Sequence, residues 1–474
     1  MPPLRHMTRV CIAGLIGSLF LIAAGIATGA AQAPDHAMYR YAYVVSETRN
    51  TLTLYAIDPR HPADAVPVYG LALPPGSQPP FSGAASPDGR WVALTFQRRG
   101  VPRADLIVFE AASGRIARWA PFGIVERRNI LEGPPPIAWS PDSRYLAYTS
   151  FVPWVFLGYR SDVFLIDMEA PVTAPPINLS ADQARQAHIG WSADSSRLAV
   201  ARWDCSASRC RLGLDVYEAE SAARIDALEI DTRVPGERWM DYVCQIAWSP
   251  DGAHISYVTH CERPPRGIRE AYVIETATGR LTQLTDSAPR MMRGDRVIAF
   301  SAEHVPQWIA DDTLLIGSAV NGFITEADGF PRIIRTNGIT AYRLSDGALA
   351  GPPLTLSPNV AQEWALSPAD ARLALRVREL TPDGNPIGAS VQIATLDGET
   401  LEVQARGPAG CDNLAWSPDG AWLAYRDLAQ YCWDQPQITL MDAISGAAAP
   451  HQLLQTSTER VLWLGWLALP DVRP

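Results

Sequence analysis

Arginine provides all of the strongly basic side chains of this chain, because the sequence has forty basic residues and none of them is lysine. A guanidinium is always charged and binds carboxylates or phosphates through paired hydrogen bonds, but it forms no Schiff base. Many of these arginines lie beside aromatic residues in Gly- and Pro-rich segments that favour loops. That composition is typical of protein interfaces and of sites for anions or sugars. The candidate binding residues are Arg127, Arg128, Trp154, Arg202, Trp203, Arg238, Trp239, Arg263, Arg266, Arg293, Arg332 and Trp433.

The competing interpretation of these arginines is structural. Acidic residues lie near many of them and would form surface ion pairs with them. Such pairs would occupy the guanidinium groups and leave no free cation for a ligand. The acidic neighbours in question are Glu126, Asp204, Glu237, Asp241 and Glu262.

Residue types that perform catalysis are present, but not in catalytic patterns. A serine hydrolase of the α/β type needs a Gly-x-Ser-x-Gly elbow, and the sequence has none. His260 beside Glu262 is the nearest approach to a metal cluster, and a surface loop explains that pair better. We therefore predict a protein without enzymatic activity that holds no metal and no cofactor.

Six aspartates recur at similar intervals, and this regularity argues against a catalytic role. A catalytic carboxylate is needed once or twice, whereas a turn former is needed at every repeat. The six are Asp88, Asp142, Asp194, Asp251, Asp370 and Asp419. They belong to a motif whose clearest copies begin at Ile137, Ile246 and Leu414 and read Ile/Leu-Ala-Trp-Ser-Pro-Asp-Gly/Ser. Weaker copies surround Ala85, Trp191, Trp308 and Leu366, so the repeat length is about 50 to 60 residues.

Each repeat predicts four antiparallel strands. The apolar residues before the motif favour a buried strand, and Ser-Pro-Asp-Gly favours a tight turn. The alternating residues that follow favour a returning strand, and two further strands complete the unit, as at 162–167 and 271–275. Repeated four-stranded units of this length are typical of the blades of a β-propeller. We expect the motif tryptophans to fill the spaces between blades.

The two ends of the chain are expected to share one blade. Residues 41–46, 51–58 and 65–73 predict three strands without a preceding motif, and residues 460–466 predict one strand with nothing after it. Pairing them closes the ring and removes exposed sheet edges. We therefore predict an all-β single propeller of eight blades, formed by residues 34–474. Seven blades is the alternative, because the repeat at Trp308 is degraded.

These motifs resemble the Pro-Asp variant of WD40-like repeats found in TolB-type periplasmic proteins and in propellers attached to prolyl-oligopeptidase-like enzymes. The resemblance covers most of residues 39–469 and implies a propeller, a fold that serves many functions. Unlike TolB, the chain is not expected to carry an extra N-terminal α/β domain. We expect a bacterial binding scaffold whose partner is a protein or an envelope polymer, with its binding surface on the arginine-bearing loops. The alternatives are a propeller enzyme of lyase, lactonase or glycan-acting type, or a regulatory propeller of a separate hydrolase.

The N-terminus predicts export to the periplasm or the extracellular space. Arg5 and Arg9 precede an uncharged run from Val10 to Ala27, and small residues follow it. We predict a signal peptide over residues 1–33, cleaved after Ala31, with an uncleaved membrane anchor as the alternative. The formal net charge of -10 argues against nucleic acid as a partner.

The cysteines are consistent with an oxidising compartment. Six of the seven follow the leader, and they fall into local pairs at the ends of predicted hairpins. Free thiols or a metal site are the alternatives. The predicted disulfides are Cys205–Cys210, Cys244–Cys261 and Cys411–Cys432.

Overall fold

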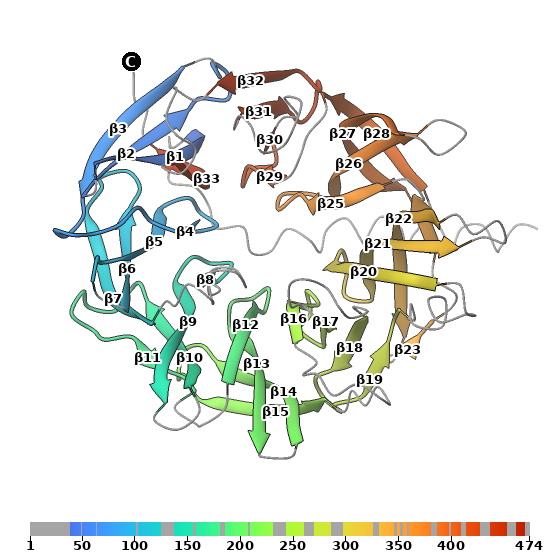
Figure 1. The fold of residues 1–474 in the computed structure, drawn as a ribbon, viewed down its shortest axis with the longest axis horizontal. Helices are drawn as coiled ribbons and strands as arrows, with labels where there is room; N and C mark the ends of the chain where they lie inside the picture. Colours follow the sequence, from blue (N-terminus) through green and yellow to red (C-terminus); the bar gives the residue numbers. More distant parts are fainter. Residues whose placement is uncertain are drawn as a thin grey trace, which may run out of the picture.

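The computed structural model is a closed ring of eight antiparallel blades, which confirms the predicted eight-bladed propeller (Figure 1). It describes residues 38–48, 50–62, 64–100, 103–124, 137–154, 158–180, 185–206, 209–230, 243–259, 270–285, 297–325, 331–345, 348–350, 354–357, 360–380, 386–397, 400–408, 414–426, 437–452 and 461–469. The predicted signal peptide therefore lies outside the described residues. Within these ranges no helix has the length and apolar character needed to cross a membrane.

The first four blades contain strands β1 to β15 and β33. Blade 1 is β33 (Val461–Leu469), β1 (Met38–Thr48), β2 (Thr51–Ile57) and β3 (Ala65–Ala72). Blade 2 is β4 (Ser82–Ala85), β5 (Trp91–Gln97), β6 (Arg103–Glu110) and β7 (Ile116–Ile124). Blade 3 is β8 (Ile137–Trp139), β9 (Tyr145–Trp154), β10 (Gly158–Asp167) and β11 (Ile177–Asn178). Blade 4 is β12 (Arg185–Trp191), β13 (Arg197–Ser206), β14 (Arg209–Glu218) and β15 (Arg224–Ile230).

The other four blades contain strands β16 to β32. Blade 5 is β16 (Val243–Trp248), β17 (His254–Thr259), β18 (Ala271–Glu275) and β19 (Leu281–Gln283). Blade 6 is β20 (Val297–Trp308), β21 (Thr313–Thr325), β22 (Pro331–Ser345), β23 (Ala348–Leu349) and β24 (Leu354–Ser357). Blade 7 is β25 (Val360–Leu366), β26 (Arg372–Leu380), β27 (Pro386–Asp397) and β28 (Thr400–Gly407). Blade 8 is β29 (Ala415–Trp416), β30 (Trp422–Arg426), β31 (Gln437–Asp442) and β32 (Ala448–Gln452).

The ring closes as predicted, through the last strand of the chain. β33 pairs antiparallel with β1, from Met38 opposite Leu469 to Val45 opposite Val461. The degraded repeat at Trp308 forms a complete blade with one additional short strand, so the seven-blade alternative is wrong. Blades 2 and 3 are also joined by one parallel bridge, between Gly123 and Phe151.

The turns of the repeated motif are stabilised by the aspartate carboxylates, which confirms their structural interpretation. In blade 3 the Ser140 hydroxyl lies 2.5 Å from Asp142 Oδ1, and that oxygen also accepts the backbone N–H of Arg144 at 3.0 Å. The Ser140 hydroxyl oxygen in turn accepts the N–H of Tyr145 at 2.8 Å. The same arrangement recurs at Asp88, Asp194, Asp251 and Asp419. These carboxylates are therefore occupied with their own turns.

Two of these turns have serine where the motif favours glycine. Ser143 and Ser195 have φ angles of 64° and 63°, a left-handed conformation that glycine adopts more easily. Each hydroxyl accepts a backbone N–H from the turn of the preceding blade, from Asp88 and Asp142 respectively, at 3.0 Å. This bond between blades explains why serine is tolerated there.

Among the described residues, six tryptophans each form a hydrogen bond that joins two neighbouring blades. Each indole N–H donates to a carbonyl of the preceding blade's inner strand; for example, Trp248 donates to Gly190 at 2.9 Å. The other five pairs are Trp139–Ala84, Trp191–Ala138, Trp308–Ala247, Trp416–Ala365 and Trp466–Ala415. The sequence predicted tryptophans between the blades. A smaller aromatic residue such as phenylalanine could not replace them, because it has no N–H group to donate to the neighbouring blade.

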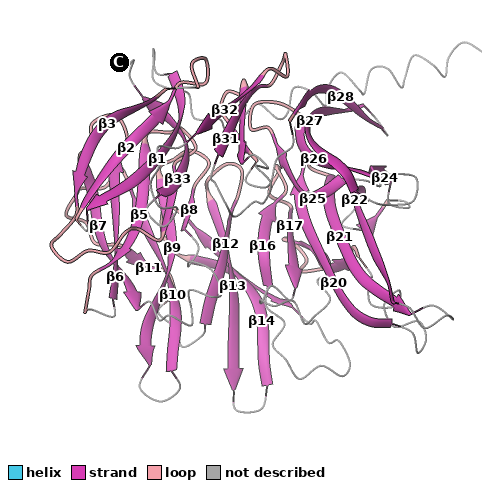
Figure 2. Cartoon of the chain, turned by 45° about the horizontal axis from the view of Figure 1, so that its top comes forward, coloured by secondary structure: helices cyan, strands magenta, loops and turns pink. Residues whose placement is uncertain are grey.

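The alternation of strands gives the propeller two distinct faces. Turns between first and second strands, and between third and fourth strands, lie on one face, which we call the turn face. Connections between second and third strands lie on the opposite face, which we call the loop face. Figure 2 shows the paired strands β9–β10 and β13–β14 extending toward the loop face.

Candidate functional site

A cavity of about 460 Å³ lies between blades 2 and 3 on the turn face. Its walls come from the motif turns of both blades, from the first half of β7, and from the loop after β10. Arginines and carboxylates dominate the lining, and Trp91, Met168 and Val172 add apolar surface. The remaining lining residues are Asp88, Arg90, Arg115, Ala117, Arg118, Asp142, Ser143, Arg144, Glu169 and Ala170.

The cavity occurs where blade 3 departs from the pattern of the other blades. In blades 2 and 5 the third and fourth strands are joined by a short turn, in which Ser113 or Thr278 bonds the preceding glutamate and a glycine follows with positive φ. In blade 3 the corresponding segment is the longer stretch from Met168 to Pro176, which contains no such glycine. The longer loop leaves space beside blade 2 that a tight turn would not.

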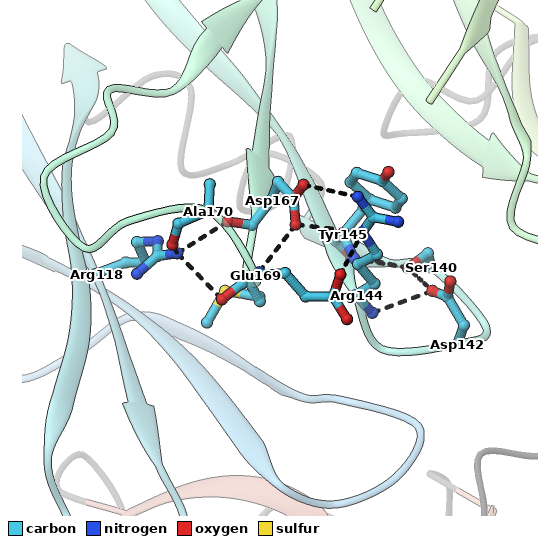
Figure 3. A network of polar contacts seen from close by, with 9 residues as sticks. Arg118, Ser140, Asp142, Arg144, Tyr145, Asp167, Glu169 and Ala170 are labelled. Atoms are coloured by element: carbon cyan, nitrogen blue, oxygen red, sulfur yellow. Dashed lines mark hydrogen bonds and ion pairs between the residues drawn. The ribbon is translucent and has the colours of Figure 1, made fainter. Parts of the chain in front are cut away.

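Arg118 fixes the position of this loop. Its side chain is buried although it lies on the outermost strand of blade 2. One terminal nitrogen, Nη2, donates to the carbonyl oxygens of Asp167 at 2.9 Å and Met168 at 3.1 Å, and also to that of Ala170 (Figure 3). Burial lowers the pKa of the Arg118 guanidinium, and the Asp167 carboxylate opposes that effect. Arg118 is therefore a clamp that joins blade 2 to the loop of blade 3.

The blade 3 wall carries one guanidinium between two carboxylates. Arg144 donates to Asp167 at 3.1 Å and lies 3.2 Å from Glu169, while its guanidinium stacks 4.8 Å from the centre of the Tyr145 ring (Figure 3). The hydrogen bond with Asp167 raises the pKa of Arg144. Burial alone would raise the pKa of Asp167, but the bonds from Arg144 and the backbone N–H of Glu169 outweigh it, so that pKa lies below its usual value. Arg144 and Asp167 therefore remain ionised at neutral pH.

The blade 2 wall has the opposite composition, one carboxylate between two guanidiniums. Glu110 lies 3.4 Å from Arg90 and 3.7 Å from Arg115. The Ser113 hydroxyl bond lowers the pKa of Glu110 most, burial acts against it, and the two arginines lower it further. Arg90 also stacks 4.6 Å from the centre of the Trp91 ring. Both arginines are more than half exposed, so each can reach a ligand.

The side chains that line this cavity offer charged and hydrogen-bonding contacts to a ligand. Among the described residues that line it, Ser143 is the only one with a hydroxyl group, and its oxygen already accepts the Asp88 N–H. Paired guanidiniums and carboxylates offer several directed hydrogen bonds to a polar ligand. In the described part of the chain no group of three or more His, Cys, Asp or Glu side chains is arranged to hold a metal.

The four candidate residues from the sequence that the structure describes lie outside this cavity. Arg202 and Trp203 are in β13, Trp154 ends β9, and Arg332 is in β22. The structure places the Arg202 side chain, 11% exposed, against Asp215 at 3.0 Å and Glu229 at 3.3 Å, which is the structural alternative for that arginine. The other candidates lie outside the described residues: Arg127, Arg128, Arg238, Trp239, Arg263, Arg266, Arg293 and Trp433.

The predicted disulfides fall partly on described backbone. Cys205 lies directly opposite Cys210 in the β13–β14 hairpin, a register compatible with a bond between them. Cys244 is in β16, opposite Val258. Cys261, Cys411 and Cys432 lie outside the described residues, so all three disulfides remain predictions.

Sequence reasoning overlooked the cavity arginines for an identifiable reason. Arg90 and Arg144 directly follow motif turns, on the face where the sequence predicts short turns. The binding surface was predicted on the opposite face, on the longer loops. The available signal was the missing Ser/Thr-Gly turn after Asp167, together with arginine at the same place in two successive repeats.

Comparison with known proteins adds structural neighbours only. No protein-family model matches the chain. No curated protein sequence matches it either. Among solved structures, dipeptidyl peptidase 4 of Porphyromonas gingivalis is 13% identical, with 96% of this chain and 63% of that chain covered and a TM-score of 0.46. A structure from a study of two prolyl endopeptidases is 12% identical, with 94% and 54% covered and a TM-score of 0.43. TolB from Acinetobacter baumannii is 14% identical, with 80% and 83% covered and a TM-score of 0.30.

This chain thus spans about half to two thirds of the length of the two peptidase structures. At identities this low the likeness concerns the arrangement of strands into blades, and it does not extend to activity.

Proposed function

We propose that this chain is an exported binding scaffold without catalytic activity, and that the cavity between blades 2 and 3 holds part of its partner, a protein or an envelope polymer. The observation that carries the proposal is the cavity, whose volume of about 460 Å³ lies within the range of roughly 300–1,000 Å³ common for ligand sites. The predicted signal peptide and the predicted cysteine pairs support export as the location.

The cavity suits binding because its walls are already ordered. Arg118 holds the loop of blade 3, and the ion pair with Asp167 holds the guanidinium of Arg144 in place. Arg90 and Arg144 are additionally stacked on Trp91 and Tyr145. A ligand entering such a site orders few side chains, so little conformational entropy is lost on binding.

The proposal of binding without turnover rests on the types of residue in the walls. A hydrolytic or lyase site needs a nucleophile or general base poised next to a reacting group. Asp88, Asp142, Glu110 and Asp167 accept hydrogen bonds from serine or backbone N–H groups. Hydrogen bonds lower the pKa of Asp167 and of Glu110 against the opposing effect of burial, so these two carboxylates are weak bases, which favours recognition over proton transfer.

A comparison of the native protein with two variants as baits tests the proposal. Val172 lines the cavity and is 61% exposed, so Val172→Trp narrows the cavity without altering a charge. Ile225→Trp is the matched control, because Ile225 is similarly exposed on β15 of blade 4. We expect an envelope extract of the source cell to yield a partner with the native protein and with the control, and not with Val172→Trp.

Two results would overturn the proposal. One is equal capture of the partner by all three proteins, which would remove the cavity from the interaction. The other is turnover of a small substrate by the purified protein, with loss of that turnover in Val172→Trp, which would make the site catalytic.

A further inference from the structure

The two walls of the blade 2–3 cavity carry opposite net charge. On the blade 2 wall, Arg90 and Arg115 share the single carboxylate of Glu110, so the group is positive. On the blade 3 wall, Asp167 and Glu169 share the single guanidinium of Arg144, so the group is negative. With the other charged lining residues included, Asp88 and Arg118 on the blade 2 wall and Asp142 on the blade 3 wall, the blade 2 wall has one excess positive charge and the blade 3 wall has two excess negative charges.

Exposure makes these excess charges available to a ligand. Arg115 is 61% exposed and lies 3.7 Å from Glu110, so its pairing is loose. Glu169 is 72% exposed, whereas its neighbour Asp167 is mostly covered and bonded to Arg144. Arg115 and Glu169 are therefore the most exposed charged residues of the two ion-paired groups, and both line the cavity.

Apolar surface is also present in the cavity. Trp91 contributes from blade 2, and Met168 and Val172 contribute from the loop of blade 3. A ligand of one sign of charge would meet an attractive wall and a repulsive one, and charges of like sign brought together disfavour the complex. A ligand with one positive end, one negative end and a short uncharged middle would meet attraction at both ends.

We infer that the cavity binds a zwitterionic ligand of peptide type, with its carboxylate at Arg115 and Arg90 and its ammonium group at Glu169. This inference rests on the proposed function, because it names the ligand class of the same site. Charge-assisted hydrogen bonds of guanidinium to carboxylate and of carboxylate to ammonium supply the selectivity. The amide groups of the peptide would lie over the apolar surface, beside the exposed turn carboxylate of Asp142.

Three probes that share the alanyl-alanine unit and differ in the groups at its two ends test the ligand class. Alanyl-alanine carries both charges, N-acetyl-alanyl-alanine carries only the carboxylate, and alanyl-alanine amide carries only the ammonium group. Titration calorimetry of the full chain should show alanyl-alanine binding at least about tenfold more tightly than either capped form. Equal affinity for all three probes, or no binding of alanyl-alanine at millimolar concentration, overturns the inference.

Two substitutions test the assignment of each wall. Arg115→Gln neutralises the blade 2 wall and should weaken binding of the acetylated probe and of alanyl-alanine by about tenfold, with little effect on the amide. Glu169→Gln should do the reverse, weakening the amide and alanyl-alanine while sparing the acetylated probe. Arg280→Gln is the matched control, because Arg280 holds the same turn position beside Glu275 in blade 5, where it does not line this cavity. If either variant lost affinity equally for all three probes, the assignment of the two walls would be overturned.

Failure of this inference can be distinguished from failure of the proposed function. If Val172→Trp abolishes capture of the envelope partner while none of the dipeptide probes binds, the cavity is a binding site for another ligand class. If the dipeptides bind as expected but capture is unaffected by Val172→Trp, the site takes free zwitterionic peptides and the envelope partner is held elsewhere. Circular dichroism of each variant confirms that the exposed substitutions leave the sheets intact.

Discussion

Replacing Trp466 by phenylalanine tests whether the hydrogen bonds from tryptophan side chains stabilise the closed propeller. Trp466 lies on β33, the strand that closes blade 1, and its side chain is 5% exposed. Its indole N–H donates to the Ala415 carbonyl of blade 8 at 2.9 Å, and its ring meets Tyr41 edge-on at 5.4 Å between centroids. Phenylalanine keeps an aromatic ring at this position but removes the donor and part of the buried surface.

The expected cost follows from these two losses. An intramolecular hydrogen bond contributes about 1 kcal/mol net, and removal of its donor leaves a buried carbonyl without that partner. The smaller ring buries roughly 50 Å² less apolar surface, which at about 25 cal/mol per Å² adds about 1 kcal/mol. We therefore expect Trp466→Phe to lower the free energy of unfolding by about 2 kcal/mol.

Urea unfolding followed by far-ultraviolet circular dichroism measures this difference. Trp119→Phe is the matched control, since Trp119 is 48% exposed on β7 and contacts Phe96 edge-on at 6.1 Å. We expect about 0.5 kcal/mol or less for the control. Equal destabilisation by the two substitutions would refute the reasoning, because the hydrogen bond between blades would then contribute nothing.

Three further predictions concern the fold. Burial lowers the pKa of His188 to about 4. Because the same side chain in the unfolded chain takes up a proton at a pKa of about 6.5, the native protein loses stability as the pH falls from about 6.5 towards 4. His188→Gln should remove up to about 3 kcal/mol of that loss between pH 7 and pH 4, measured by urea unfolding against the native protein. Asp142→Ala should destabilise by about 1–2 kcal/mol through loss of its two turn hydrogen bonds, whereas Asp226→Ala, an exposed aspartate that bonds only the next residue, should change thermal stability little. Alkylation without reduction should leave Cys205 and Cys210 unmodified in peptide mass spectra; alkylation of both would contradict the predicted disulfide.

The sequence was a good guide to the ring because the signals for it are local. Ser140 and Asp142 stabilise a turn within their own blade, and the same residues recur at each repeat. The count of eight blades was less secure, since the repeat at Trp308 has lost its Ser-Pro-Asp-Gly turn. Trp308 nevertheless keeps its bond to the Ala247 carbonyl of blade 5, so contact between blades preserves the unit where the turn motif has decayed.

The candidate site was less accessible to sequence reasoning because it depends on contacts between blades. Arg118 and the carbonyl of Asp167 are 49 residues apart in the chain and belong to different blades. Nothing in the residues around Arg118 indicates a buried guanidinium that donates to a loop of the next blade. The opposite charges of the two walls become visible only when Arg115 and Glu169 are seen to line one cavity.

The amino-acid sequence alone determined the repeat, the turn at each blade and the sharing of one blade by the two ends of the chain, because turn chemistry and strand alternation act over a few residues. Tertiary structure alone decided which arginines are occupied, as Arg202 is with Asp215, and which face a cavity, as Arg115 does. The physical reason is that the partners of a long charged side chain are set by the packing of neighbouring blades. A change of a few residues in one loop therefore creates a site that no single repeat contains.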